Sequence, residues 1–179
     1  MLSVGQTAPD FSLPGVRHGV ARLFELFRPI DDGRSVVLCV YPSAFTPPAV
    51  AELRALDAAG WETSSDAVVW CLTGDSVYAN AAFGDRYDVP FAMLSDFHAG
   101  VADAYGVCLD DWEAHGPAPG RAYFLVDPDW TVRYARSVDD PFASPDPSPV
   151  ISLAEALASL VDDQGLASDT VSVEYDRYA

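Results

Sequence analysis

The residues best suited to chemistry lie in one short segment, residues 42–52, which reads Pro-Ser-Ala-Phe-Thr-Pro-Pro-Ala-Val-Ala-Glu. It joins an apolar run at residues 36–41 to a helical spacing that begins with Leu53 and Leu56. The first N–H groups of a helix lack partners and favour negative charge, so a cysteine there would be held as a thiolate. Ala49 takes that place instead. The segment therefore predicts a site suited to a reactive anion but without a nucleophile.

Two neighbouring features admit a plain structural interpretation as well as a functional one. Thr46 and Pro47 form an ordinary helix start, because threonine caps helices well and proline is favoured at the first helical position. Arg121 stands before an apolar run, as a surface charge at a strand end would. Taken alone, each feature favours the structural interpretation.

The three cysteines are a second source of chemistry. Their odd number and wide spacing argue against a disulfide framework, and the sequence contains no Cys-x-x-Cys. Cys39 and Cys71 fall in apolar runs, so we expect them to be small core residues. Cys108 follows a predicted helix end and is the candidate for a substitute reactive thiol.

Metal and cofactor sites have no sequence support. His18, His98 and His115 are far apart and show no ligand spacing, and we find no glycine-rich phosphate loop. The acidic run at residues 110–113 is predicted to be a solvated loop. We therefore expect no bound cofactor and no metal.

The elements that must position these residues alternate along the chain. Apolar runs predict strands at residues 35–41, 66–73, 91–94, 121–127 and 131–136, after an extended segment at 5–13 that is an edge strand at best. Spacing and capping residues predict helices at residues 21–28, 46–60, 76–87, 96–106 and 151–162. The last two strands flank Asp127-Pro-Asp-Trp130, a hairpin turn. This order predicts an α/β fold with a central mixed β-sheet and helices on both faces.

A length of 179 residues favours one domain, and half of the residues are hydrophobic. We expect this domain to cover residues 1–163, with a proline-stiffened loop at 139–149. Residues 164–179 are predicted to form an acidic C-terminal tail. We see no signal peptide and no apolar stretch long enough to span a bilayer, so the expected location is the cytoplasm.

The formal net charge is -17, and all ten basic residues are arginine. An acidic surface of this kind repels nucleic acid and anionic membranes, so neither is an expected partner. It suits a salt-loving cytoplasm, where high salt screens self-repulsion. An ordinary acidic protein from an arginine-rich proteome is the alternative to this halophilic origin.

Several segments, in this order, resemble the peroxiredoxins, the AhpC/TSA family with a thioredoxin-like fold. The resemblance extends over about residues 4–162. The segments that carry it are residues 4–11, 42–52, 73–76, 94–96, 104–107 and 121–127. Residues 42–52 are similar to the family's active-site motif, Pro-x-x-x-Thr-x-x-Cys, and keep its frequent downstream glutamate.

The resemblance implies roles for single residues. In the family a cysteine thiolate attacks a hydroperoxide and a thiol reductant restores it. Thr46 would orient the peroxide, Pro42 would shield the pocket from water, and Arg121 would stabilise negative charge. The position of the peroxidatic cysteine falls on Ala49. The resemblance also implies a homodimer.

The missing thiol leaves three functional hypotheses. The chain is a peroxiredoxin-family protein without its catalytic cysteine, either a natural non-catalytic homologue or an active-site variant. Alternatively, it is a binding or assembly protein that uses the thioredoxin fold. The third hypothesis is a thiol oxidoreductase that uses Cys108.

Overall fold

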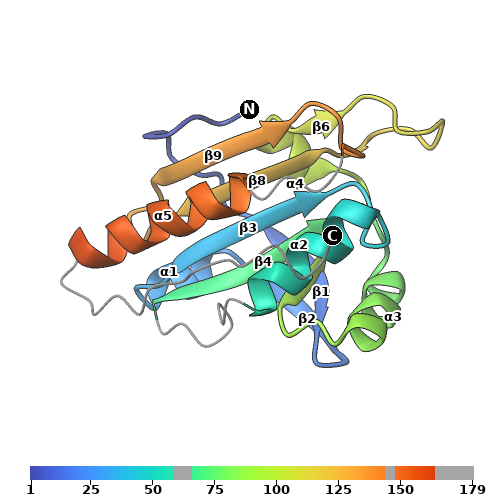
Figure 1. The fold of residues 1–179 in the computed structure, drawn as a ribbon, viewed down its shortest axis with the longest axis horizontal. Coiled ribbons are helices and arrows are strands. Elements are labelled where there is room, and N and C mark those ends of the chain that lie inside the picture. Colours follow the sequence, from blue (N-terminus) through green and yellow to red (C-terminus); the bar gives the residue numbers. More distant parts are fainter. Residues whose placement is uncertain (59–65, 144–147, 164–179) are drawn as a thin grey trace.

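A computed structural model describes residues 1–58, 66–143 and 148–163 (Figure 1). Within these residues the centre is a seven-stranded sheet with the order β2-β1-β5-β4-β3-β8-β9. Its strands are β1 Ser12–Arg17, β2 Val20–Glu25, β3 Ser35–Tyr41, β4 Ala67–Thr73, β5 Ala92–Ser95, β8 Arg121–Val126 and β9 Val132–Val138. The short strands β6 Cys108–Leu109 and β7 Ala118–Pro119 form a separate pair. The predicted tail, residues 164–179, lies outside the described residues.

The sheet is mixed, as predicted. Strands β3, β4 and β5 run parallel, whereas β8, β9, β1 and β2 are joined to their neighbours in antiparallel fashion. The helices are α1 Phe27–Asp31, α2 Pro47–Ala58, α3 Val77–Tyr87, α4 Gly100–Ala104 and α5 Ser148–Asp163. The α/β architecture expected from the sequence, a central mixed sheet with helices, is confirmed.

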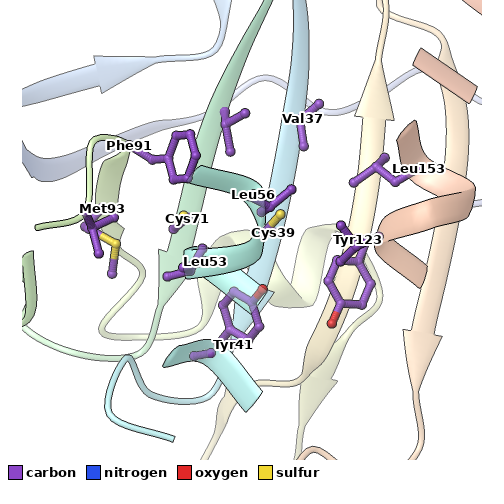
Figure 2. Packing of buried hydrophobic residues seen from close by; sticks show 14 of the residues in the cluster. Val37, Cys39, Tyr41, Leu53, Leu56, Cys71, Phe91, Met93, Tyr123 and Leu153 are labelled. Atoms are coloured by element: carbon purple, nitrogen blue, oxygen red, sulfur yellow. The ribbon is translucent and has the colours of Figure 1, made fainter. Parts of the chain in front are cut away.

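Strand β3 divides the core into two layers because its side chains alternate. Val37, Cys39 and Tyr41 face a cluster that includes buried residues of α2, α3 and α5. The residues between them face a second cluster, to which α1 and α4 contribute. Helices therefore cover both faces of the sheet (Figure 1). Figure 2 shows the first cluster, with the Cys39 and Cys71 sulfur atoms among apolar side chains.

The helix predicted at residues 21–28 is wrong. These residues belong mainly to β2, which forms a hairpin with β1, and α1 covers only Phe27–Asp31. The reason is the turn between the strands. His18 and Gly19 both have positive φ, 49° and 72°, which is the backbone that a two-residue hairpin turn requires.

Two helix starts also differ from the prediction. Asp96 does not begin α4, whose N-cap is Ala99, but its carboxylate accepts hydrogen bonds from the N–H groups of Val101 and Ala102 at 3.2 and 2.8 Å. Helix α5 begins at Ser148, inside the predicted 139–149 loop. Pro149 does not prevent this, because proline is tolerated in a first helical turn.

The predicted hairpin between the last two strands of the sheet is confirmed. The Asp127 carboxylate accepts hydrogen bonds from the N–H groups of Asp129 and Thr131 at 2.9 and 2.8 Å and so closes the turn. Trp130 has a φ of 63°, a left-handed conformation that favours glycine. Among the described residues, no helix combines the length and apolar character needed to cross a bilayer.

Candidate active site

The loop that carries Pro42 is fastened to the carboxyl end of β4. The Pro42 carbonyl accepts a hydrogen bond from Gly74 N–H at 3.2 Å. The Asp75 carboxylate accepts hydrogen bonds from the Ser43 hydroxyl at 3.0 Å and from Ala44 N–H at 2.7 Å. These contacts hold a buried proline where two parallel strands end, which is a usual place for binding sites in α/β sheets.

Helix α2 begins directly after this loop, at Pro47. The Thr46 hydroxyl donates to the Ser43 carbonyl at 2.9 Å, and Val50 N–H donates to the Thr46 carbonyl at 3.1 Å. Pro47 and Pro48 have no N–H group. Ala49 is therefore the first residue of α2 with a backbone donor, so this helix end stabilises an anion less than most do.

Ala49 is fully buried, and its methyl group belongs to the cluster that joins α2 to the sheet. Glu52 follows three residues later, so the two residues share one face of the helix. The Glu52 carboxylate is also fully buried. A buried carboxylate needs partners, because burial of an unpaired charge costs several kcal/mol.

Arg121 and two tyrosines supply these partners. One Nη of Arg121 donates to Glu52 Oε1, and the Tyr123 hydroxyl donates to Glu52 Oε2. The Tyr41 hydroxyl donates to the same oxygen at 2.9 Å. Arg121 further donates from Nε to the Tyr123 hydroxyl at 3.0 Å and from its other Nη to the Ala143 carbonyl at 2.9 Å. Every nitrogen of this buried guanidinium thus has an acceptor.

Burial and the neighbouring charges shift the pKa values of Glu52, Arg121 and Tyr123. Burial raises the pKa of Glu52, although Arg121 and the two tyrosine hydroxyls act against the shift. Burial also disfavours the charge of Arg121, but Tyr123 and Glu52 outweigh it and raise the pKa of the guanidinium. Burial and the Glu52 charge raise the pKa of Tyr123, so its hydroxyl stays protonated and can donate.

None of the three cysteines provides a ready thiolate near this network. Cys39 and Cys71 are fully buried partners in the register of β3 and β4, and burial raises the pKa of both thiols. Cys108 lies in β6 and is partly exposed. Burial and the charges of Asp103 and Asp110 raise the pKa of this third thiol. The buried-core interpretation of Cys39 and Cys71 agrees with this placement.

The predicted site residues come together from two parts of the chain. Pro42, Thr46 and Ala49 lie in the same segment as Glu52, and Glu52 pairs with Arg121 of β8. Their catalytic roles stay a prediction. The sequence reasoning missed Asp75 as the anchor of the loop and missed both tyrosines. Tyr123 had a detectable signal, because residues two apart on a strand share a face and Arg121 is two residues earlier.

In the described part of the chain, no group of three or more His, Cys, Asp or Glu side chains could hold a metal ion. The fold and the site instead define a thioredoxin-like α/β protein in which a strand-to-helix loop leads into a helix whose glutamate pairs with a buried arginine. Residues 4–135 match the model of the AhpC/TSA family. The chain belongs to this peroxiredoxin family.

Curated relatives agree with this membership. The chain is 33% identical over 141 residues to the selenocysteine-containing peroxiredoxin PrxU of Peptoclostridium acidaminophilum. That match covers 74% of this chain and 66% of the relative, slightly less than two thirds of its length. The thiol peroxidase of Mycobacterium tuberculosis is 31% identical over 142 residues, with 77% of this chain and 79% of that protein covered.

Solved structures match over nearly the whole chain. AhpC of Mycobacterium tuberculosis superposes with a TM-score of 0.74 at 22% identity and covers 95% of this chain and 99% of its own. Peroxidoxin BcpB of the same organism gives a TM-score of 0.70 at 25% identity, covering 94% and 100%. The likeness to AhpC shows the fold.

Proposed function

We propose that this chain is a peroxiredoxin-family protein that retains the frame of the peroxide site and does not reduce peroxide. The observation that carries the proposal is the surroundings of residue 49. A buried methyl group stands in the first turn of α2, on the helix face that carries Glu52 and its partner Arg121. The similarity of residues 42–52 to the family's active-site motif supports the interpretation of this position as that of the missing thiol.

The chemistry explains why the methyl group is decisive. In thiol-dependent reduction a thiolate attacks one peroxide oxygen, the O–O bond breaks, water or an alcohol leaves, and the sulfur becomes a sulfenic acid. The Ala49 methyl group has no lone pair with which to form the first bond. A more distant nucleophile does not replace it, because attack requires reacting atoms about 3–3.5 Å apart. Pro42, Thr46 and Arg121 remain as the frame around this position, with their polar groups engaged inside the protein.

Peroxide consumption with a thiol reductant tests this proposal. We expect no turnover by the natural chain and measurable turnover by Ala49→Cys. In that variant the positive charge of Arg121 would lower the thiol pKa and so favour the thiolate, whereas the end of α2, which opens with two prolines, would add little. Ala49→Ser is the matched control, since it has nearly the same shape without the sulfur, and should stay inactive.

The outcomes separate the alternatives. Turnover by the natural chain would refute the non-catalytic assignment. An inactive but folded Ala49→Cys variant would contradict the retention of a working frame around Pro42, Thr46 and Arg121. In either case, mass spectrometry after a sulfenic-acid trap identifies the cysteine that reacts.

Use of Cys108 as a substitute thiol is the weaker candidate. Burial and nearby acids raise the pKa of the Cys108 thiol, so little thiolate forms at neutral pH. Its folded pKa lies above the ordinary thiol value of 9.0, so alkylation by iodoacetamide at pH 8 should be slower in the folded protein than in urea. Faster alkylation in the folded state would favour a reactive Cys108.

Binding or assembly through the same fold is the functional alternative, and a homodimer is its simplest form. Tyr78 and Phe97 are 87% and 62% exposed and line one apolar cavity of about 440 Å³. Exposed aromatic residues of this kind are common in protein interfaces. Light scattering after size exclusion tests the dimer, and Tyr78→Asp should shift it toward monomer if this surface is used.

We also propose a cytoplasmic protein adapted to high salt, a proposal that the net charge of -17 supports. At molar salt the Debye length falls to roughly 3 Å, so repulsion among acidic side chains is screened. The free energy of unfolding should therefore rise between low and molar potassium chloride. Equal stability at both concentrations would count against the adaptation.

A further inference from the structure

A second group of arginines surrounds a surface groove with a volume of about 430 Å³. Four of the ten basic residues of the sequence line it, although the chain as a whole carries a charge of -17. They are Arg17, Arg22, Arg28 and Arg34. Glu25 and Asp32 are its acidic lining residues, so arginines outnumber acidic residues in the lining of the groove.

The topology places this arginine groove away from the candidate active site. Arg34 precedes β3, and Val68 and Trp70 line the groove from the first half of β4. Pro42 and Gly74 follow the opposite, carboxyl ends of the same two strands. A seven-residue strand spans roughly 20 Å, so the groove and the candidate active site lie at opposite ends of the sheet.

Arg22 is held by an aromatic ring. Its guanidinium lies over the Phe24 ring, 4.7 Å from the centroid. The ring reaches this position across β1 because Gly15 has no side chain there, since a Cβ on Gly15 would stand 2.9 Å from the ring. Stacking uses the flat face of the guanidinium and leaves its N–H groups pointing outward from the edge. Within the described residues this guanidinium has no ion-pair partner.

Backbone and carboxylate contacts orient the other three arginines. Arg17 donates from Nε to the Pro90 carbonyl at 3.1 Å, and Arg34 donates from one Nη to the Ala67 carbonyl at 2.6 Å. Arg28 pairs through Nε with Glu25 at 2.6 Å while its side chain stays 74% exposed. The four cations are thus held around one cavity instead of being spread over the acidic surface.

We propose that the arginine groove binds a small molecule that carries a phosphate or diphosphate group. Forked guanidinium groups match the geometry of phosphate oxygens, and two or more of them can bind one group at once. A cavity of about 430 Å³ admits a small phosphorylated molecule. A long polyanion is excluded by its own length, because it would extend over the surrounding acidic surface.

Calorimetric titration with inorganic pyrophosphate tests the proposal at fixed ionic strength. We expect saturable binding at one site per chain. Arg22→Gln and Arg28→Gln should each raise the dissociation constant about tenfold, which is the loss of affinity expected for one charge-assisted hydrogen bond. Both side chains are exposed, so both variants should fold, and circular dichroism verifies this.

Arg86→Gln is the matched control, because Arg86 is also an exposed arginine over an aromatic ring, 5.6 Å from the Tyr87 centroid. It removes the same charge from a place outside the groove. We expect its dissociation constant to stay within about twofold of the natural value. An absence of saturable binding would overturn the site. Equal weakening by Arg86→Gln would replace it with a general effect of charge.

A lipid headgroup could offer the same phosphate chemistry as a free molecule. Vesicles of phosphatidylcholine with and without phosphatidylglycerol distinguish the two sources. We expect no sedimentation with either vesicle, because the protein and an anionic membrane repel each other. Sedimentation with the anionic vesicles that Arg22→Gln abolishes, without pyrophosphate binding, would overturn the proposal of a small ligand.

Discussion

The protein uses arginine in opposite ways at the two ends of its sheet. At one end, Arg121 is fully buried and each of its nitrogens has an acceptor among Glu52, Tyr123 and the Ala143 carbonyl. At the other, Arg22 lies exposed over a ring with no ion-pair partner among the described residues. Arginine is fully compensated at the first end, whereas at the second it outnumbers the acidic residues that line the groove.

This difference teaches how to separate structural from ligand-directed charge. A buried pair is costly to break, because either partner alone leaves an uncompensated charge in the core. An exposed charge contributes little to stability, so its arrangement around a cavity needs another explanation. Substitutions should therefore act on stability at the Arg121 end and on ligand affinity at the Arg22 end.

The largest effect is expected from Arg121→Met. The substitution keeps much of the side-chain volume and leaves Glu52 buried without its cation, so the free energy of unfolding should fall by about 3–5 kcal/mol. Urea denaturation at neutral pH measures the loss. Arg86→Met, at an exposed arginine, is the control and should change stability little. A loss of less than about 1 kcal/mol for Arg121→Met would remove the contrast between the two ends.

Tyr123→Phe should have the next largest effect. It removes the hydroxyl that donates to Glu52 and accepts from Arg121. Leaving buried polar groups unsatisfied costs about 1–3 kcal/mol. Denaturation of Tyr78→Phe provides the comparison, because that tyrosine is 87% exposed and should lose nothing measurable. Equal stability of the two variants would mean that water replaces the Tyr123 hydroxyl.

A more gradual effect is expected from pH. Burial raises the folded-state pKa of Glu52 above its ordinary value of 4.5, so the folded protein keeps this proton where the unfolded chain has lost it. The natural chain should therefore lose stability relative to Glu52→Gln as pH rises from 4.5 through the folded pKa. Denaturation of both proteins across this range measures the difference. A difference that moves the other way would show that Arg121 outweighs burial.

The smallest effect on stability is expected at the other end of the sheet. Arg22→Gln should leave the free energy of unfolding within about 0.5 kcal/mol of the natural value, because its guanidinium is exposed. Thermal unfolding and pyrophosphate titration on the same sample test the pair of expectations together. A large loss of stability would make Arg22 a structural residue like Arg121.

The sequence predicted the fold well where the pattern of side chains is local. Apolar runs predicted β3, β4 and β8, and the turn at Asp127 predicted the hairpin. The helix expected at residues 21–28 failed, because hairpin pairing with β1 outweighed the local helical pattern. His18-Gly19 carried the missing signal, since both residues tolerate the left-handed backbone of a tight turn.

The candidate site was predictable in part for the same reason. The motif at residues 42–52 and the position of Arg121 were visible in the sequence, and the role of each residue there stays a prediction. Only the two-residue spacing of Tyr123 from Arg121 hinted at a partner of Glu52, because Tyr41 and Tyr123 meet Glu52 only when β3 and β8 pair beneath α2. The arginine groove depends in the same way on a hairpin and two distant strand ends coming together.

The two prolines that open α2 limit what can be observed at this site by amide exchange. Pro47 and Pro48 carry no amide proton, and the Val50 proton is held by the Thr46 carbonyl. The Ala49 amide is thus the single early reporter of the helix turn. A ligand that accepts its hydrogen bond would slow deuterium uptake at this one peptide group, whereas a ligand held by Arg121 alone would leave its rate unchanged.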